Sequence, residues 1–401
     1  MTSNISLEEA VAISCANINV LGCEHIHIND AFMRVSADNI VSFIDIPSFD
    51  RSSMDGYAIG RADLEILNTG NSLSLQVTDI IQAGSIESKQ IRAGETFKIM
   101  TGALVPEGSA AVIKQEDVKF YINRNIITAC GSQKQGENIC QTGQELKAGD
   151  QVASKGQLLT GEVLERIAAC GIDKINVYKK PRVSVIDTGS ELLLPGSHIK
   201  KGQIYASSRS LLSGKIKGAG AIPLLSDCIV EDDLQVIANE IEKAAMVSDM
   251  VIITGGTGKG VYDLVYKTFE YLNAKPLFRG INIIPGKGAS VVLFNGKILF
   301  NVSGNPCAAG LLFEVLIKPA LQKLSGDLFS SQKWFDIKLG CPLKVVKPVR
   351  NLCQGEMIFE QGSIYAQPIN KNSNHIINNP LILDIQAGQG ATGDMVKAKL
   401  I

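Results

Sequence analysis

Residues 250–263 carry the residue types and spacing that point most clearly to chemistry. An apolar run ends there in a turn that contains Gly255, Gly256, Gly258 and Gly260. Glycines let the backbone take positive φ angles and approach an anion closely, and a helix N-terminus after the turn adds free N–H groups. A buried parallel strand followed by such a turn marks the edge where open α/β sheets bind ligands. The pattern predicts a phosphate site, and a turn that is glycine-rich for steric reasons alone is the alternative.

Two carboxylates follow predicted strand ends and are candidates for metal binding and catalysis. Asp263 lies where a helix is expected to begin after the glycine turn, and it would repel phosphate unless a cation lay between them. Because Mg²⁺ prefers one or two carboxylates together with phosphate oxygens, Asp263 predicts Mg²⁺ at this turn. Glu191 follows the strand expected at 183–186, where it could share the metal or orient water. Acids that merely stabilise the first turn of a helix are the alternative for both.

Two short motifs of the same region are candidates for ligand binding. Pro285-Gly286-Lys287 offers a lysine, which is a flexible point charge suited to oxyanions. Gly304-Asn305-Pro306 precedes a long predicted helix, whose N-terminus could bind an anion. An exposed turn lysine and an ordinary helix cap remain the alternatives. Nearer the N-terminus, Asp55 and Thr101 lie in polar loops, where an Asx-turn and ordinary turn polarity would explain them structurally.

The predicted elements divide the chain into three regions that must position these residues. Residues 1–178 begin with a helix and continue as short alternating strands separated by Gly, Pro and Asn, so we expect a β-rich region of two subdomains. Strands alternate with helices over 179–325, which predicts a doubly wound parallel α/β domain. A polar linker precedes 334–401, where short strands predict a small β-barrel or sandwich.

Bulk properties exclude several classes of protein. The 401 residues carry a net charge of −1 and no basic stripe, which argues against nucleic-acid binding. No apolar run is long enough for a membrane span, and no signal peptide is recognisable. The nine cysteines form no CxxC pair or other zinc-like spacing. We therefore expect a soluble, cytoplasmic protein without a membrane or nucleic-acid partner.

Several motifs occur in one order along the chain, and together they resemble a known family. They are Ser53-Met-Asp-Gly-Tyr-Ala58, Met100-Thr-Gly-Ala103, Gly136-Glu-Asn-Ile139, Asp187-Thr-Gly-Ser-Glu-Leu192, the glycine turn, Pro285-Gly-Lys287 and Gly304-Asn-Pro306. The chain resembles, over nearly its whole length, the molybdopterin molybdenumtransferases, the family that includes the C-terminal domain of gephyrin. The resemblance implies a split N-terminal part, an α/β molybdopterin-binding domain and a small C-terminal β-domain.

The resemblance also implies a reaction and a set of substrates. The family cleaves adenylyl-molybdopterin, releases AMP and inserts molybdate into the dithiolene with the help of Mg²⁺. Its members are homodimers in which the α/β domain of one subunit and the N-terminal region of the other form the cleft. A molybdopterin adenylyltransferase is a further expected partner. By position, Asp55, Thr101, Glu191 and Asp263 would be catalytic, the last two as metal ligands. Glu145 and Asp232 or Asp233 match other acidic family positions.

The chain departs from the family pattern mainly by losing cations. Gly288 replaces the proline usual after Pro-Gly-Lys, and Cys140-Gln-Thr142 stands where relatives carry arginine. Glu356 and Glu360 lie near further positions of missing arginines. Compensation by Arg209, Lys259 or Arg279 is one expectation, and weakened polyanion binding is the other.

Two alternative functions remain open, one because of the sequence of the glycine turn and the other because of the lost cations. Its sequence Thr254-Gly255-Gly256-Thr257-Gly258 is closer to the sister family, the molybdopterin adenylyltransferases. An adenylyltransferase on the longer scaffold is therefore the enzymatic alternative. The lost cations motivate a non-catalytic pterin-binding paralogue as the other. The choice between molybdenum and tungsten is also open, because both arrive as similar oxyanions.

Overall fold

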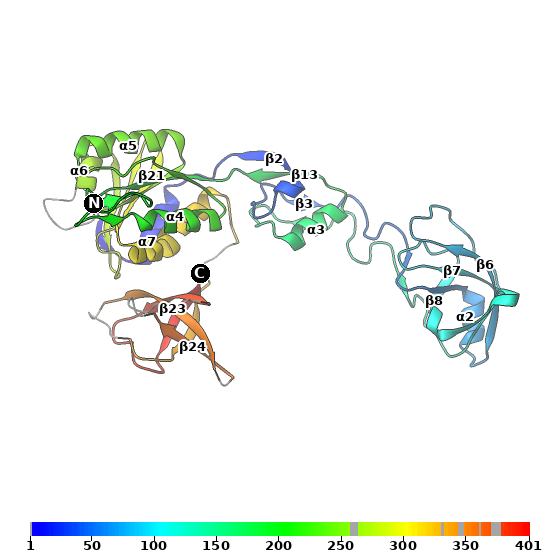
Figure 1. Cartoon of the computed structure of the whole chain (residues 1–401). Coiled ribbons are helices and arrows are strands. Elements are labelled where there is room, and N and C mark those ends of the chain that lie inside the picture. Colours follow the sequence, from blue (N-terminus) through cyan, green and yellow to red (C-terminus); the bar gives the residue numbers. More distant parts are fainter. Residues whose placement is uncertain (1, 257–263, 330–332, 344–348, 361, 370–377) are drawn as a thin grey trace. The chain divides into compact units, whose positions relative to one another are not determined.

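The computed structural model describes residues 2–256, 264–329, 333–343, 349–360, 362–369 and 378–401 (Figure 1). The chain forms two compact units. The first comprises residues 1–38, 155–160 and 175–401, and the second comprises residues 39–154 and 161–174.

A seven-stranded sheet organises the first unit, and a continuous apolar sequence explains its centre. All five residues of β18, Met250–Thr254, are buried, as expected for a strand covered on both faces. Every paired neighbour in the sheet is parallel except β20, which runs antiparallel to both of its neighbours. The strand order is β1 (Thr2–Ile5), β19 (Lys275–Ile281), β20 (Ser290–Phe294), β21 (Lys297–Val302), β18, β14 (Arg182–Asp187) and β17 (Ile222–Leu225).

Helices cover both faces of this sheet, so the predicted doubly wound arrangement is confirmed (Figure 1). One core cluster joins the sheet to α1 (Leu7–Ala16), α4 (Ser207–Gly218), α7 (Pro306–Leu312), the π-helical turn η4 (Phe313–Ile317) and α8 (Lys318–Leu324). The other joins it to α5 (Leu234–Val247) and α6 (Leu264–Tyr271). Local caps set the helix starts: Ser6 and Glu9 form a capping box at α1, and the Asp233 carboxylate accepts N–H bonds at α5.

The sheet differs from the expected one in two respects. Residues 2–5, which we expected to belong to the N-terminal β-rich region, instead form β1 at the edge of the sheet beside β19. β20 and β21 form an antiparallel hairpin, because Asn295 and Gly296 adopt positive φ in the two-residue turn that joins them. The remaining short elements of the first unit are β2 (Cys23–His27), η1 (Ile28–Asp30), β13 (Lys174–Tyr178), β15 (Leu192–Leu193) and β16 (Ile204–Tyr205).

The second unit has a six-stranded sheet of its own, as the β-rich composition predicted. Its order is β8 (Ser109–Lys114), β5 (Gly56–Gly60), β7 (Glu95–Ile99), β6 (Leu73–Ile81), β10 (Ile126–Ala129) and β9 (Val118–Tyr121). The buried residues of β6 alternate with exposed ones at its start, which is the pattern of a half-buried strand. Smaller elements are β3 (Ile40–Val41), β4 (Arg51–Ser52), α2 (Arg61–Leu67), η2 (Gln115–Asp117), η3 (Ile122–Arg124), β11 (Ile139–Cys140), β12 (Gln151–Ala153) and α3 (Gly161–Ala169).

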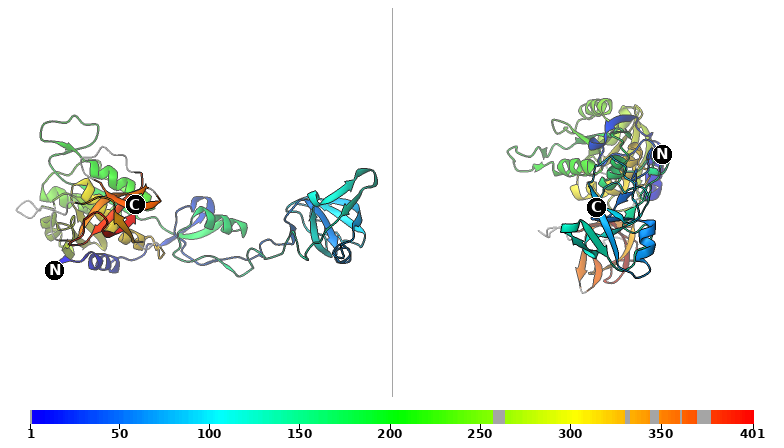
Figure 2. Two further views of the ribbon diagram at one scale, coloured as in Figure 1. Left: turned by 90° about the horizontal axis from the view of Figure 1, so that it is seen from below. Right: turned by 90° about the vertical axis from the view of Figure 1, so that its right-hand side faces the viewer.

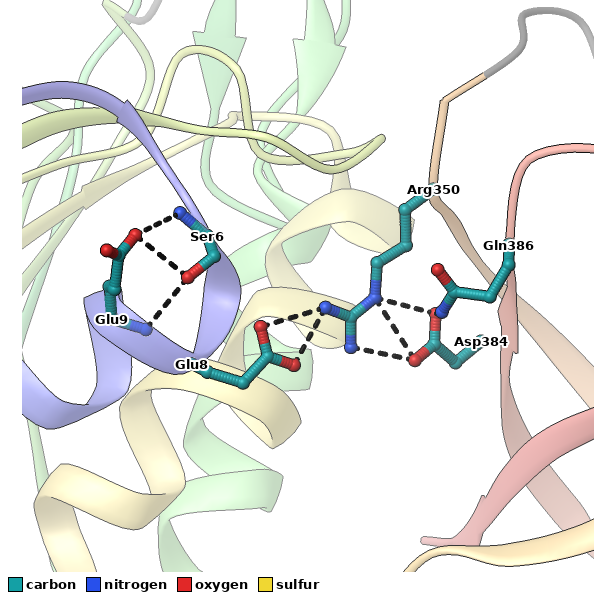
Figure 3. Close-up of polar contacts among 6 residues, drawn as sticks. All are labelled: Ser6, Glu8, Glu9, Arg350, Asp384 and Gln386. Atoms are coloured by element: carbon teal, nitrogen blue, oxygen red, sulfur yellow. Dashed lines mark hydrogen bonds and ion pairs between the residues drawn. The ribbon is translucent and has the colours of Figure 1, made fainter.

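The C-terminal strands close into a barrel, which confirms the first of the two sequence alternatives (Figure 2). Its order is β22 (Phe335–Leu339), β24 (Ser363–Pro368), β23 (Asn351–Glu360), β25 (Pro380–Ile385) and β26 (Met395–Leu400). One guanidinium ties this barrel to the α/β part of the unit. Arg350 binds the buried carboxylate of Asp384 on β25 and the exposed carboxylate of Glu8 on α1, each at 2.8 Å (Figure 3).

Candidate functional site

Several predicted site segments emerge at one edge of the seven-stranded sheet. Asp187, Thr254 and Val302 are register partners at the ends of β14, β18 and β21, so the turns that follow them leave the sheet together. β19 runs antiparallel to β20, which runs antiparallel to β21, and the β19–β20 loop therefore lies at the same edge. The structure thus brings Glu191, the glycine turn, Pro285-Gly286-Lys287 and Gly304-Asn305-Pro306 to one carboxyl edge, where open α/β sheets bind ligands.

Glycine is required at the first two positions of the turn because neighbouring atoms leave no room for a side chain. A Cβ on Gly255, where φ is +104°, would lie 2.4 Å from the carbonyl oxygen of Thr188. A Cβ on Gly256, where φ is +59°, would lie 2.5 Å from a methyl carbon of Val265. Gly304 in turn packs against the Gly255 backbone. The glycines therefore allow three chain segments to approach one another at this edge.

A buried carboxylate, which the sequence reasoning did not single out, anchors the start of the turn. Asp187 is fully buried and accepts a 2.8 Å hydrogen bond from the Thr254 hydroxyl. Arg209 lies 3.9 Å from its other oxygen and also donates to the carbonyl of Ser226. Burial raises the pKa of Asp187, and the Thr254 hydrogen bond and the Arg209 charge oppose that shift. Arg209 therefore serves to balance the Asp187 charge, and the contact between Asp187 and Thr254 fixes where the glycine turn begins.

Among the described residues, the Glu191 carboxylate at this edge has no ion-pair partner. Its side chain is exposed and lies over Gly189, where a Cβ would meet it at 2.7 Å. The neighbouring Ser190 donates its N–H to Asp232 at 3.2 Å, which ties this turn to the segment before α5. Asp232 thus has a structural partner, and Asp233 is the N-cap of α5. Glu191 is the acid of this group that remains available to a ligand or metal.

The two anion-binding motifs differ in what the structure shows for them. Lys287 is exposed, so its ammonium group is accessible from solvent. The residue before its motif, Ile284, exchanges backbone hydrogen bonds with Arg350 and Leu352 at the start of the barrel. Asn305 is the N-cap of α7, where its side chain accepts from the Ala308 N–H at 3.3 Å. Helix capping therefore accounts for Asn305. The Lys287 side chain, in contrast, makes no hydrogen bond or ion pair within the described residues.

Part of the predicted site lies outside the described residues. This applies to Thr257, Gly258, Lys259 and Asp263. Of the cations expected to compensate for lost arginines, Arg279 stacks on the ring of Tyr266 at 4.1 Å. Glu356, near a missing arginine, is buried and accepts a hydrogen bond from the Asn378 N–H at 2.9 Å.

In the second unit the structure brings two predicted residues into direct contact. The Thr101 N–H and hydroxyl both donate to one oxygen of Asp55, each at 2.7 Å. The Thr101 donors hold the pKa of Asp55 below its usual value, with the backbone donor contributing most. Gly56 must be glycine, since its Cβ would lie 2.1 Å from the Ile113 carbonyl oxygen. The loops before β5 and after β7 are therefore locked around an ionised carboxylate.

A second polar group of this unit contains the position where relatives carry arginine. Arg51 donates to Glu145 at 2.6 Å, and the Cys140 sulfur lies 3.9 Å from the same carboxylate oxygen. Glu145, which matches an acidic family position, is thus paired within its own unit. Arg51 therefore places a cation beside Cys140, and this cation is paired with Glu145.

Metal binding was predicted at Asp263 and Glu191. In the described part of the chain, no group of three or more His, Cys, Asp and Glu side chains could hold a metal ion by itself. Mg²⁺ does not require such a group, because it is often held by one or two carboxylates and completed by phosphate oxygens and water. The exposed carboxylate of Glu191 fits that requirement. No described helix is long and apolar enough to cross a membrane.

Comparisons with known proteins agree with the motif order and the fold. The family described as MoeA N-terminal region (domain I and II) matches residues 5–171, and the family described as probable molybdopterin binding domain matches residues 184–323. The molybdopterin molybdenumtransferase of Staphylococcus epidermidis is 34% identical over 328 residues, which are 80% of this chain and 76% of that protein. The chain belongs to the molybdopterin molybdenumtransferase family. This confirms the resemblance inferred from the motifs.

Other members of the family extend the comparison. The molybdopterin molybdenumtransferase of Bacillus subtilis is 31% identical over 79% of this chain and 74% of its own length. A crystal structure of the molybdopterin biosynthesis MoeA protein from Pyrococcus horikoshii is 28% identical with a TM-score of 0.81, and the match covers 100% of both chains. The match to that structure includes the C-terminal barrel.

Proposed function

We propose that this enzyme inserts molybdate into adenylylated molybdopterin and cleaves the pyrophosphate with release of AMP. The similarity to molybdopterin molybdenumtransferases over 80% of the chain carries this proposal. The position of the glycine turn at the carboxyl edge of the sheet supports it, because open α/β sheets bind their ligands at that edge. We place the reaction in the cytoplasm and expect a molybdopterin adenylyltransferase to deliver the substrate.

The residues at this edge would each bind a different part of the substrates. The backbone of Gly255 and Gly256, together with Thr257 and Gly258, would cradle the pyrophosphate. The Lys287 ammonium would neutralise a phosphate or molybdate oxygen, and the Gly304-Asn305-Pro306 turn would line the same cradle. Charge-assisted hydrogen bonds of this kind contribute roughly 1.5–3 kcal/mol each. Lys287 is therefore the described cation at this edge on which affinity should depend most.

Mg²⁺ is the metal that the carboxylates would hold. Glu191 and Asp263 would bind it, and the bound ion would supply a Lewis acid for the pyrophosphate. Asp187 and Thr254 would keep the turn in place without touching the ligand. A matched pair of variants tests the assignment: Glu191→Gln should lower AMP release by about a hundredfold, whereas Glu231→Gln, a similarly exposed acid before α5, should change it little.

We further propose that the active form is a homodimer, to which Asp55 and Thr101 of one chain contribute in the cleft of the other. The support is that Asp55 is half-buried and Thr101 exposed, so the carboxylate that their mutual bonds hold in place is accessible to a ligand. An ionised Asp55, held by two donors, would position the substrate or a water molecule rather than donate a proton.

Two alternatives remain distinguishable by experiment. A molybdopterin adenylyltransferase would form adenylyl-molybdopterin from molybdopterin, ATP and Mg²⁺. A transferase would instead release AMP from supplied adenylyl-molybdopterin when molybdate is present. A non-catalytic pterin-binding paralogue would do neither and would tolerate Asp55→Asn and Asp263→Asn without loss of function.

Genetic complementation is the decisive test of the proposal. Expression of this chain in a transferase-deficient strain should restore molybdoenzyme activity, and expression in an adenylyltransferase-deficient strain should not. The reverse result would establish the sister activity, and failure in both strains with normal expression would favour the non-catalytic paralogue. Competition between molybdate and tungstate in the AMP-release assay would then identify the metal.

A further inference from the structure

A pocket lies at the amino ends of strands of the seven-stranded sheet, opposite the edge that carries the glycine turn. Its volume is about 440 Å³, within the range of small-molecule sites. Pro181, directly before β14, and Gly218 to Gly220, directly before β17, line it, so it opens at the amino ends of these strands. β14 spans six residues, which at about 3.3 Å per residue puts roughly 15–20 Å between this pocket and the glycine turn. The pocket is therefore separate from the proposed catalytic edge.

Positive charge dominates the lining of this pocket. The basic residues that line it are Arg34, Lys179, Lys180, Lys318, Lys333 and Lys399. Asp327 is the one acid among the described residues that line it. Arg34 is neutralised by Glu24 at 2.5 Å, but Lys179 and Lys180 are exposed and have no ion pair in the described part of the chain. Such an excess of one sign raises the local concentration of anions.

Next to the pocket, one buried carboxylate is shared among more lysines than it can balance. Glu314 is buried and pairs with three lysines: Lys215 at 2.7 Å, Lys318 at 3.1 Å and Lys399 at 3.7 Å. Two of these, Lys318 and Lys399, also line the pocket. The side chain of Lys399 is only 9% exposed, so its ammonium group lies where an uncompensated charge is costly. An anion in the pocket would relieve that cost.

The rest of the lining fits an organic molecule better than a bare ion. Met33, Val35, Leu158 and Phe329 contribute apolar surface beside the cations. A pocket of this size is larger than inorganic phosphate requires. We propose that this pocket is a binding site for a small phosphate-bearing molecule, whose phosphate lies against Lys179, Lys180 and Lys399 and whose organic part contacts the apolar side chains.

Calorimetric titration of the full-length protein near physiological ionic strength tests this site, with inorganic phosphate and AMP as probes. The variant is Lys179→Glu with Lys180→Glu, which reverses two exposed charges and spares the core. Its control is Lys200→Glu with Lys201→Glu, an adjacent exposed pair outside the lining that makes the same charge change. Lys287→Ala separates this site from the proposed catalytic one.

The expected result is phosphate binding that weakens roughly tenfold or more in the Lys179/Lys180 variant and is retained in the Lys200/Lys201 and Lys287 variants. Tighter binding of AMP than of phosphate would support an organic phosphate as the ligand, and equal binding would contradict the contact of an organic part with the apolar side chains. Absence of binding to the wild type, or an equal loss in both double variants, would overturn it. A loss confined to Lys287→Ala would also overturn it, because binding would then belong to the catalytic edge.

A proton measurement gives an independent readout. Burial lowers the pKa of Lys399 to about 8, with Lys318 and Lys215 adding to the shift and Glu314 opposing it. A bound anion stabilises the charged ammonium, so binding above pH 8 should take up a proton, seen as a dependence of the heat on buffer ionisation. The Lys399→Met variant should lose this uptake. Proton uptake that persists in the variant would contradict the assignment of the phosphate to Lys399.

Discussion

The paired Asp55 and Thr101 illustrate how a single loop residue can set the charge state of another. Both donors of Thr101 converge on one oxygen of Asp55, and they stabilise the ionised form. The loop before β5 and the loop after β7 lie side by side, because these two neighbouring strands are antiparallel. The sequence identified both residues but not their contact, because 46 residues separate them.

Removing only the hydroxyl of Thr101 should raise the pKa of Asp55. Thr101→Ala keeps the N–H donor and loses the side-chain donor, whereas Thr101→Ser keeps both. The carboxyl titration followed by NMR should therefore shift upward in Thr101→Ala alone. Because the folded-state pKa is depressed, the stabilisation by this contact is present above the unfolded pKa and is lost as the pH falls through the folded one. Identical titrations in both variants would show that the backbone donor acts alone.

Gly255 and Gly131 have nearly the same φ angle, so substitutions at these two positions separate the cost of backbone strain from the cost of crowding. Gly255 at +104° faces the Thr188 carbonyl, whereas Gly131 at +105° has nothing within 4 Å of its would-be Cβ. Gly131→Ala should cost about 1–2 kcal/mol through its positive φ. Gly255→Ala should cost roughly 1–3 kcal/mol more, because the crowding atom is backbone. Denaturant unfolding measures both, and equal costs would mean that the Thr188 segment yields easily.

Lys399 predicts a specific pH dependence of stability. Its folded-state pKa is lowered to about 8 from the ordinary value of 10.5. Between these values the unfolded state binds more protons than the folded state, so this residue makes stability rise with pH over that window. The difference in unfolding free energy between wild type and Lys399→Met should therefore grow in favour of the wild type from pH 8 to 10. A flat difference would show that Glu314 fully compensates the charge.

At the scale of elements, Arg350 joins α1 to strand β25 through two carboxylates that differ in burial. The side chain of Asp384 is 5% exposed, whereas that of Glu8 is 67% exposed. Two carboxylates raise the pKa of Arg350, so it stays charged throughout the accessible pH range. Because Arg350 directly precedes β23, its contact with Asp384 lies within the barrel, and its contact with Glu8 is the one that reaches the α/β part (Figure 3).

Substitutions of the three residues should separate these contributions. Arg350→Met leaves Asp384 buried and unpaired, which should cost about 3–5 kcal/mol. Glu8→Gln removes only an exposed partner and should cost less than about 1 kcal/mol. Thermal unfolding gives both costs, and a smaller cost for Glu8→Gln would show that the exposed contact between barrel and α/β part adds little to stability. Equal losses for both variants would show that the Glu8 contact carries most of the effect of Arg350.

Periodicity predicted most elements of the α/β part but not all of their partners. The apolar runs of β14 and β18 are buried because both faces of the sheet are covered, and that signal is readable from sequence. β1 has four residues and a polar sequence, so its pairing depends on β19 rather than on its own pattern. Asp187 was not predicted as an anchor because its role depends on Thr254 and Arg209, which only the fold brings near.

At the scale of the whole molecule, the homodimer proposal makes a quantitative prediction. Chains carrying Asp55→Asn and chains carrying Glu191→Gln would each be inactive alone. If each site draws on two chains, mixed dimers contain one intact site, and random mixing should restore about a quarter of the wild-type activity. The assay is AMP release after the variants are unfolded and refolded together. No recovery would mean that each site uses residues of a single chain.

Edge strand β1 also bears on how the protein is made. Thr2 pairs with Phe278 and Ile5 with Ile281, so β1 is synthesised long before the strand with which it pairs. Such distant pairing slows folding, because loop-closure entropy is lost before the contact stabilises anything. Until β1 pairs with β19, that edge of β19 is open to strands of other chains. Chaperone dependence and aggregation during expression should therefore respond to changes at residues 2–5 far more than their number suggests.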